Sequence, residues 1–298
     1  MKTTMNYFLA AGAILLASCG SGSGHFDAMG TFEATEVIVS SEANGKLMRF
    51  DVAEGQRLGM GQEVGYVDTV QLYLTKVRLQ ESNRAVLSNL PDVKKQIAAT
   101  RQEIDKQRTE KSRYEALVAG NAANQKQVDD IDSRLKVLEK QLEAQLSTLQ
   151  NNTRSISGES AAIMAQIEQM EDQLNKCRIV SPINGTVLTK YAEQGELATQ
   201  GRALFKIADM DQVFLRAYIT SDQLSDIKLG QELALFADYG NDNLKEYKGA
   251  VTWISDKAEF TPKSILTKNE RANLVYAVKI AVKNDGYLKI GMYGQVKL

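Results

Sequence analysis

Histidine, cysteine and proline are scarce in this chain of 298 residues, which contains one histidine, two cysteines and three prolines. A zinc site of the usual kind needs several cysteine or histidine ligands, so these counts exclude one. The single imidazole, His25, lies in a Gly/Ser stretch, and a Ser-His-Asp or Cys-His active site would depend on that one linker residue. We therefore expect no catalytic residue, no metal and no cofactor.

The chain also lacks a charge excess of either sign. It has 36 Lys and Arg against 37 Asp and Glu, for a formal net charge of −1. A protein that follows phosphate backbones carries a basic surface, so we expect no nucleic-acid partner. A chain of this length can still bury a real core and can hold two or three modules.

The N-terminus begins Met-Lys and continues with an apolar run over residues 7–17, too short to span a bilayer. The run ends in Leu-Ala-Ser-Cys19, which resembles the bacterial lipobox. That resemblance implies a lipoprotein signal peptide over residues 1–18, lipidation of Cys19, and a flexible tether over 19–32. The alternative is an ordinary signal peptide with an incidental cysteine.

The second cysteine, Cys177, has no partner within the chain once Cys19 is lipidated. A fold held together by disulfides is thereby excluded, even in an oxidising compartment. We expect Cys177 to pack as a small apolar residue.

The middle of the chain is poor in helix breakers, because residues 71–176 contain two of the 21 glycines and one proline, Pro91. This distribution predicts a helical segment between two glycine-rich arms. Apolar residues recur there at a spacing of seven, which is typical of a coiled-coil seam. The repeating positions are Val128, Leu135, Leu142, Leu149, Ile156, Ile163 and Met170.

Residues 120–124, Gly-Asn-Ala-Ala-Asn, predict a reversal that folds this helical segment into an antiparallel hairpin. Pro91 and Asn151, the first of an Asn-Asn pair, lie at equal distances along the sequence on either side of Asn121. We therefore expect both arms to bend or break at one level. A helical bundle folded on itself is the alternative to the two-helix seam.

The arms on either side of the hairpin contain a sequence repeat with one constant offset. The same distance along the chain separates the members of four matching pairs: Asn44 and Asn184, Gly45 and Gly185, Gly55 and Gly195, and Gly61 and Gly201. Each unit predicts short strands joined by tight turns, so the two units together predict one small β-sandwich that the hairpin splits.

The last third of the sequence alternates apolar and polar residues over several short runs, which predicts an antiparallel β-barrel. The runs cover residues 213–219, 233–236, 250–254 and 274–280. A short helix fits Ser221 to Ile227, with Ser221 as its cap.

The split sandwich resembles the lipoyl-like domain of HlyD-type membrane fusion proteins. Residues 177–185, Cys-Arg-Ile-Val-Ser-Pro-Ile-Asn-Gly, are similar to the motif by which that family re-enters the sandwich after its hairpin. The turn at residues 67–70, where true biotinyl or lipoyl carriers hold a modified lysine, contains no lysine. A swinging-arm carrier is therefore disfavoured.

The resemblance implies an elongated α+β fold: a split lipoyl-like β-sandwich interrupted by a long antiparallel coiled-coil hairpin, followed by an antiparallel β-barrel. The boundaries it implies are 33–70 and 177–210 for the two half-sandwiches, 71–176 for the hairpin, and 211–298 for the barrel.

The function implied by the resemblance is that of a non-enzymatic periplasmic adaptor for efflux or secretion. It would join an inner-membrane transporter to a TolC-like outer-membrane channel, as a homo-oligomer in a hexameric ring, and would be lipid-anchored, with the inner membrane favoured. The loop at 260–263, the closing turn at 288–292 and the chain's end at Leu298 look most like adaptors of ABC-type exporters, favoured over RND-type pumps. The alternative is a structural or adhesive surface lipoprotein that uses the coiled coil as a spacer.

The hairpin tip, at about 114–127, carries the candidate docking residues. Arg113, Leu117 and Asn124 resemble the family signature for docking onto a TolC-like channel, with Asn124 where serine is usual. The alternatives are a solvated charge for Arg113 and a last seam residue for Leu117. The nearby acidic cluster of Asp129, Asp130 and Asp132 is interpreted as a helix-dipole partner and not as a calcium or catalytic site.

Overall fold

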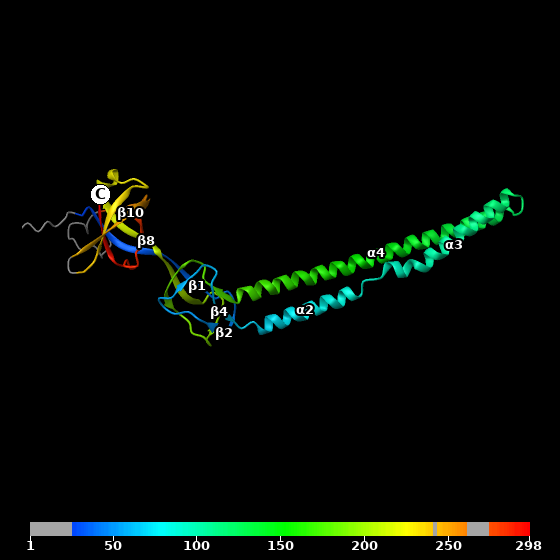
Figure 1. Ribbon diagram of the computed structural model, residues 1–298, viewed down its shortest axis with the longest axis horizontal. Coiled ribbons are helices and arrows are strands. Elements are labelled where there is room, and N and C mark those ends of the chain that lie inside the picture. Colours follow the sequence, from blue (N-terminus) through cyan, green and yellow to red (C-terminus); the bar gives the residue numbers. More distant parts are fainter. Residues whose placement is uncertain (1–25, 241–242, 261–273) are drawn as a thin grey trace, which may run out of the picture.

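The computed structural model describes residues 26–240, 243–260 and 274–298. A β-barrel, a small β-sandwich and a long helical hairpin follow one another along an elongated molecule (Figure 1). The predicted fold class, an elongated α+β protein with a split sandwich, a long hairpin and an antiparallel barrel, is confirmed. The signal peptide, Cys19 and His25 lie outside the described residues.

The sandwich is built from short strands that lie on both sides of the hairpin in the sequence. Those before the hairpin are β2 (Gly45–Phe50), β3 (Arg57–Leu58) and β4 (Glu63–Val67). Those after it are β5 (Arg178–Val180), β6 (Gly185–Lys190) and β7 (Leu197–Ala198). Two longer strands, β1 (Ala28–Ser40) and β8 (Ala203–Thr220), complete it. Strand β6 begins as far along the chain from β2 as β7 does from β3 and β8 does from β4. This common separation is the offset of the sequence repeat, so the structure confirms the repeat.

The two halves of the sandwich exchange strands. Strand β3 pairs with β6, where Arg57 lies opposite Thr186, and β7 pairs with β2, where Leu197 lies opposite Lys46. These two pairings are equivalent under the offset of the repeat, so an approximate two-fold axis relates the halves. Neither half can satisfy its backbone hydrogen bonds without the other.

The repeated glycines occupy turns that bind the opposite half. Gly61 and Gly201 have φ angles of +76° and +85°, the left-handed region that favours glycine. The Gly61 N–H donates to the Ser181 carbonyl over 2.8 Å, and the Gly201 N–H donates to the Ser41 carbonyl over the same distance. The repeat in the sequence therefore marks positions that hold the halves together.

Both halves contribute to one buried core. Its residues are Leu47, Phe50, Val52, Leu58, Val64, Val67, Cys177, Ile179, Val187, Ala192, Ala198, Leu204, Phe205 and Ile207. Cys177 is fully buried, as predicted, and its thiol donates to the Gln173 carbonyl over 3.3 Å. Burial also raises the pKa of this thiol, which keeps it protonated and inert.

The barrel is an antiparallel sheet that closes on itself. Strand β1 pairs with β8 and with β13 (Tyr293–Lys297), and the circuit continues through β9 (Glu232–Asp238), β10 (Leu244–Ile254) and β12 (Leu274–Lys283) back to β8. A short strand, β11 (Glu259–Phe260), pairs with the start of β12. Alternate residues of β8, such as Leu215, Ala217 and Ile219, fill the barrel interior.

The long strands β1 and β8 run from the barrel into the sandwich (Figure 1). Between the two domains the pairing shifts, because Ala34 lies opposite Val213 while Thr35 lies opposite Asp209. The extra residues bulge from β8 and bend the sheet at the junction. The expected tether over 19–32 is wrong at its C-terminal end: residues 28–31 pair with β13 and are part of the barrel.

The short helix predicted at 221–227 is a 3₁₀ turn, η1 (Gln223–Asp226), and its cap is Asp222 instead of Ser221. The Gln223 side chain explains the difference, because its Oε1 accepts from the Thr220 backbone N–H over 2.9 Å. This bond ties the turn back to the last residue of β8.

The hairpin has one interrupted arm and one continuous arm. The first arm consists of α2 (Val70–Ser88) and α3 (Val93–Ala119), and both pack against α4 (Gln125–Lys176) (Figure 1). The predicted break at Pro91 is present, whereas the break predicted at Asn151-Asn152 is wrong. Proline removes a backbone donor and disfavours the helical conformation of the residue before it, while asparagine in a helix interior costs only about 0.7 kcal/mol.

The buried seam of α4 changes register where the first arm breaks. Val128, Leu135 and Leu149 follow the spacing of seven, and the buried positions then move to Ser160 and Ile167. The Ser160 hydroxyl donates to Asn83 Oδ1 over 2.7 Å, which satisfies the one polar seam position.

Two glycines with opposite surroundings test this description. Gly158 lies in α4 with open space where a side chain would be, so Gly158→Ala should stabilise the hairpin by about 0.5–1 kcal/mol. A Cβ at Gly185 would overlap the Ala208 carbonyl oxygen, so Gly185→Ala should lower stability. Denaturant unfolding followed by helical circular dichroism measures both, and effects of the same sign would contradict the assignment.

Candidate functional site

The hairpin tip is a tight turn between α3 and α4 with a defined hydrogen-bond pattern. The Ala122 N–H donates to the Leu117 carbonyl over 2.8 Å, and the Asn121 N–H donates to the Val118 carbonyl over 3.0 Å. Asn121 has a φ of +58°, the left-handed conformation that ends helices in this way and that asparagine tolerates. The reversal thus lies at residues 120–124, as predicted.

Asn124 caps the N-terminus of α4, the second arm of the hairpin. Its backbone is extended, and its side-chain oxygen accepts from the Lys126 N–H over 3.1 Å. This contact satisfies one of the free donors at the start of α4, a role that serine and asparagine share. The replacement of serine by asparagine in the tip signature is therefore compatible with the turn.

Arg113 and Leu117 lie one helical turn apart on the same face of α3. The Arg113 side chain is 64% exposed, pairs with Glu110 over 2.8 Å, and lies over the Tyr114 ring. Leu117 is 38% exposed, unlike the buried seam residue Val128. Both side chains are therefore accessible to a partner.

The structure does not join the three predicted docking residues into one contact network. Within the described ranges, no hydrogen bond connects Asn124 with Arg113 or Leu117. Two of them lie on α3 and the third lies across the turn. The tip offers an accessible guanidinium and an accessible leucine beside a structural cap, which suits surface recognition.

An ion-pair cluster that sequence reasoning missed fixes the register of the helices behind the tip. Asp132 of α4 binds Lys111 of α3, and it also pairs with Lys136 over 2.7 Å. The interpretation of Asp132 as a helix-dipole partner is wrong, because it lies beyond the first turn of α4 and pairs with lysines. The sequence could have predicted this ion pair, because Lys111 and Asp132 lie on opposite arms at similar distances from the turn at 120–124.

The described acidic residues of the tip form no metal site. Asp129 accepts from Gln125 over 3.1 Å, and the described chain contains no group of three acidic, cysteine or histidine side chains placed to hold a metal ion. The lysine hydrogen bonds hold the pKa of Asp132 at about 2 and raise the pKa of Lys111.

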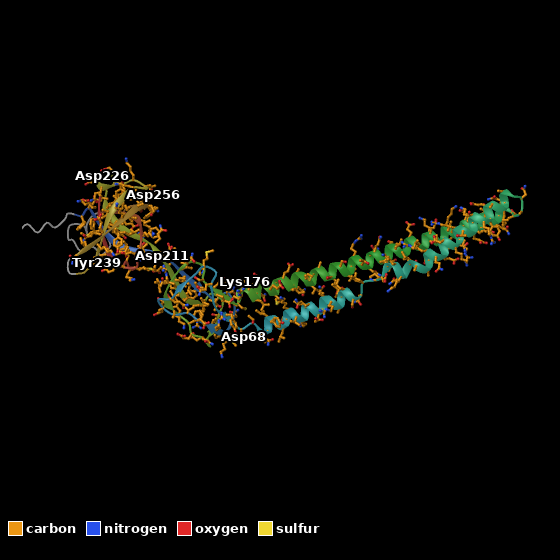
Figure 2. All side chains as sticks on the ribbon, in the orientation of Figure 1. Asp68, Lys176, Asp211, Asp226, Tyr239 and Asp256 are labelled. Atoms are coloured by element: carbon orange, nitrogen blue, oxygen red, sulfur yellow. The ribbon has the colours of Figure 1, made fainter. Side chains whose placement is uncertain are left out.

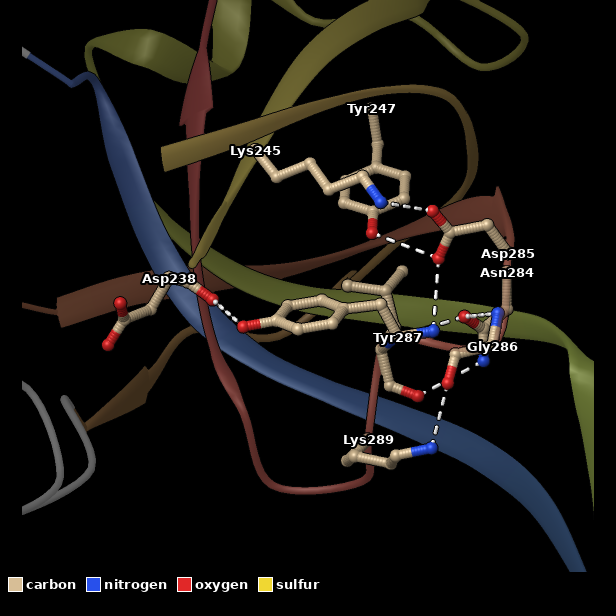
Figure 3. Close-up of polar contacts among 9 residues, drawn as sticks. Asp238, Lys245, Tyr247, Asn284, Asp285, Gly286, Tyr287 and Lys289 are labelled. Atoms are coloured by element: carbon tan, nitrogen blue, oxygen red, sulfur yellow. Dashed lines mark hydrogen bonds and ion pairs between the residues drawn. The ribbon is translucent and has the colours of Figure 1, made fainter. Parts of the chain in front are cut away.

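A second polar cluster lies in the barrel (Figure 3), and its Asp285 lines a hollow that Gly55 and Thr186 of the sandwich also line. Asp285 binds the Lys245 ammonium and accepts from the Tyr247 hydroxyl over 3.1 Å, and its pKa is lowered to about 2, chiefly by Lys245. The ammonium also lies 5.4–5.5 Å from the ring centroids of Tyr239, Tyr247 and Tyr287. This cage of aromatic rings is filled by the protein's own cation, so it ties β10 to the loop after β12 and leaves no room for a ligand.

The same loop holds the bulge at the domain junction. Asn284 donates from Nδ2 to the Met210 carbonyl over 2.8 Å and to the Leu288 carbonyl over 3.0 Å. An ion pair between Arg57 of the sandwich and Asp211 of the bulge lies beside it. Both groups are exposed, so this pair orients the junction and adds little stability.

A barrel, a split sandwich and a projecting hairpin in this order define the class of membrane fusion proteins. The comparison with family models agrees: residues 35–210 match the barrel-sandwich hybrid domain of RND membrane fusion proteins. The match covers more than half of the chain, and the chain belongs to this family.

Known relatives extend the similarity to nearly the whole chain. The UPF0194 membrane protein YE2891 of Yersinia enterocolitica is 26% identical over 93% of this chain and 93% of its own length. The UPF0194 membrane protein YbhG of Salmonella arizonae is 35% identical over 42% of this chain and 37% of its own length.

Two solved structures share the fold. MacA from Actinobacillus actinomycetemcomitans has a TM-score of 0.54 and 18% identity, covering 90% of this chain and 76% of MacA. The membrane fusion protein Spr0693 from Streptococcus pneumoniae R6 has a TM-score of 0.50 and 18% identity, covering 90% of this chain and 96% of that protein. Membrane fusion proteins are in general adaptors and not enzymes. Among the described residues, no helix is long and apolar enough to cross a membrane.

The pKa of Asp132 provides a test of the tip geometry. Because it is lowered from 3.8 to about 2, the ion pair is fully formed above the ordinary carboxyl pKa and is lost as the pH falls toward 2. Lys111→Met should move this pKa back toward its ordinary value, as measured by NMR titration of the carboxyl group. Glu143, whose pKa is lowered by Lys140, serves as an internal control and should not respond. An unchanged Asp132 midpoint would show that the arms do not meet as described.

Proposed function

We propose that this protein is a non-enzymatic periplasmic adaptor that links an inner-membrane transporter to an outer-membrane channel for efflux or secretion. The observation that carries the proposal is the placement of the two ends. The hairpin joins β4 to β5 at one end of the sandwich, and β1 and β8 leave the other end toward the barrel (Figure 1). With 52 residues, α4 extends about 78 Å at 1.5 Å per residue.

We further propose that the channel is TolC-like and binds the hairpin tip. The support is the accessible pair Arg113 and Leu117 at the free end of the hairpin, together with the resemblance of these positions and Asn124 to a docking signature. A guanidinium can bind carbonyl or carboxylate oxygens at a channel rim, and a leucine can fill a groove beside it.

Site-specific crosslinking tests this docking. A photoreactive residue at 113 or 117 should capture an outer-membrane channel in cells, because these side chains lie exposed at the tip. The same reagent in place of Lys140, which is 81% exposed but lies along the shaft of α4, is the matched control. Capture of no channel from either tip position would exclude docking and would favour the alternative, a spacer lipoprotein.

The inner-membrane partner is proposed to be an ABC-type transporter. The support is the resemblance of the closing turn to that of ABC-exporter adaptors; in the structure, Leu288 is fully buried and the Gly291 N–H donates to the Phe32 carbonyl over 2.8 Å. The family model is named for RND pumps, so the two classes must be distinguished directly. Purification of the whole chain in mild detergent should recover a transporter with an ATP-binding subunit, and recovery of an RND pump would contradict this part.

A ring of several copies, hexameric in the proposal, would enclose the conduit between these partners. Its support is the unusual exposure of apolar side chains on the sandwich. Ile38, Met60 and Leu197 are 55%, 73% and 65% exposed. Three exposed apolar side chains on one small domain favour its association with other copies of this chain.

Anchoring through Cys19 completes the proposal and would hold the barrel near a membrane, with the inner membrane favoured. Cys19→Ser should abolish incorporation of labelled fatty acid and release the protein into the soluble periplasmic fraction. Cys177→Ser should keep the label, since that thiol is buried. Equal labelling of the wild-type and Cys19→Ser proteins would exclude this anchor.

A further inference from the structure

The barrel exposes a group of large apolar side chains that its own fold does not use. Leu229, Trp253, Phe260 and Leu274 are 67%, 40%, 83% and 55% exposed. We call these four residues the rim patch. Soluble surfaces rarely gather side chains of this size without a binding partner.

The rim patch is continuous. Leu229 and Trp253 line one hollow of about 620 Å³, which Tyr276 of β12 also lines. Leu274 lies two residues before Tyr276 on the same strand face, and Phe260 lies directly opposite Leu274 in the pairing of β11 with β12. The four side chains therefore extend around one edge of the barrel.

This edge lies at the end of β8 away from the sandwich, because Val275, next to Leu274, pairs with Thr220, the last residue of β8. Asp226 and Asp256 lie in the upper part of the barrel in Figure 2. The N-terminal segment enters at the same end. Gln223 of η1 donates from Nε2 to the Asp27 carbonyl over 2.7 Å, and the neighbouring Leu224 lines the hollow. Cys19 precedes Asp27 by eight residues, a span of at most about 28 Å.

We propose that the rim patch contacts the surface of the lipid bilayer beside the anchor. The orientation rests on the proposed lipidation of Cys19, which would keep this end of the barrel within reach of the membrane. Tryptophan and phenylalanine favour the interface between headgroups and acyl chains, where the exposed edge of the barrel would lie.

Charge does not drive this contact. The exposed charged residues described beside the patch are Asp222, Asp226 and Asp256 together with Lys228 and Lys257, so they form no basic surface for anionic headgroups. Contact with a bilayer therefore depends on apolar area, and it should persist at high salt, where attraction between charges is screened.

The only tryptophan of the chain is Trp253, so its fluorescence reports on the rim patch alone. The mature chain with Cys19→Ser, which has no lipid, is mixed with vesicles of phosphatidylethanolamine and phosphatidylglycerol. We expect a blue shift of the emission, quenching by brominated acyl chains, and little change at high salt. An unshifted spectrum with vesicles present would overturn the proposal.

A pair of substitutions identifies the contact. Leu229→Ser combined with Phe260→Ser should weaken vesicle binding by about tenfold or more, measured by co-sedimentation. Val137→Ser is the matched control, because Val137 is 66% exposed on α4, far from the barrel. Unchanged thermal unfolding shows that both variants fold, and equal vesicle binding by the two variants would overturn the proposal.

Other occupants give different results. A blue shift that depends on protein concentration without vesicles would show that a second copy covers the patch. Vesicle binding that falls at high salt and is unchanged by the patch substitutions would indicate that charged residues outside the patch bind the headgroups. Either result contradicts bilayer contact. Since the measurement uses unlipidated protein and no channel, its failure leaves the tip and Cys19 experiments unaffected.

Discussion

The exchange of strands between the two half-sandwiches is the constraint on which the rest of the structure depends. Strand β3 needs β6, and β7 needs β2, so the segments before and after the hairpin must meet for either to be satisfied. This meeting brings Val67 and Cys177 together, with a hydrogen bond of 2.9 Å from the Val67 N–H to the Cys177 carbonyl, although the whole hairpin separates them in the sequence. The hairpin therefore leaves and re-enters the domain at one point and must project outward.

The approximate two-fold axis also explains why the hairpin and the barrel lie at opposite ends. Strand β4 and the first part of β8 are equivalent members of the repeat. The chain leaves the sandwich after β4 to form the hairpin, and it leaves after the equivalent part of β8 to form the barrel. Continuous hydrogen bonding along β1 and β8 then joins the barrel to the sandwich, with the bulge near Asp211 as the place where the sheet bends. The adaptor role proposed above would need this linear arrangement, with the barrel and the hairpin tip at opposite ends.

The two arms of the hairpin differ in continuity. Helix α4 continues unbroken past Asn151-Asn152, while the first arm is interrupted at Pro91. The interruption moves the buried seam onto Ser160 and Ile167, and the Asn83 side chain compensates for the polar position. The proline therefore interrupts the helix of the first arm, while the helix of the second arm, α4, stays continuous over its full length.

The residue pattern by itself determined the order of modules, the repeat with its constant offset, the turn at 120–124 and the burial of Cys177, because each depends on local conformational preference or periodic burial. Apart from the break expected at Asn151-Asn152, where asparagine disfavours a helix too weakly to end it, the pattern failed where a contact between distant segments decided the outcome. The pairing of residues 28–31 with β13, the Lys111–Asp132 pair behind the tip and the closure of Lys245 within three tyrosine rings were set by tertiary structure. A sequence shows which side chains are available, but strand exchange and helix register decide which of them meet.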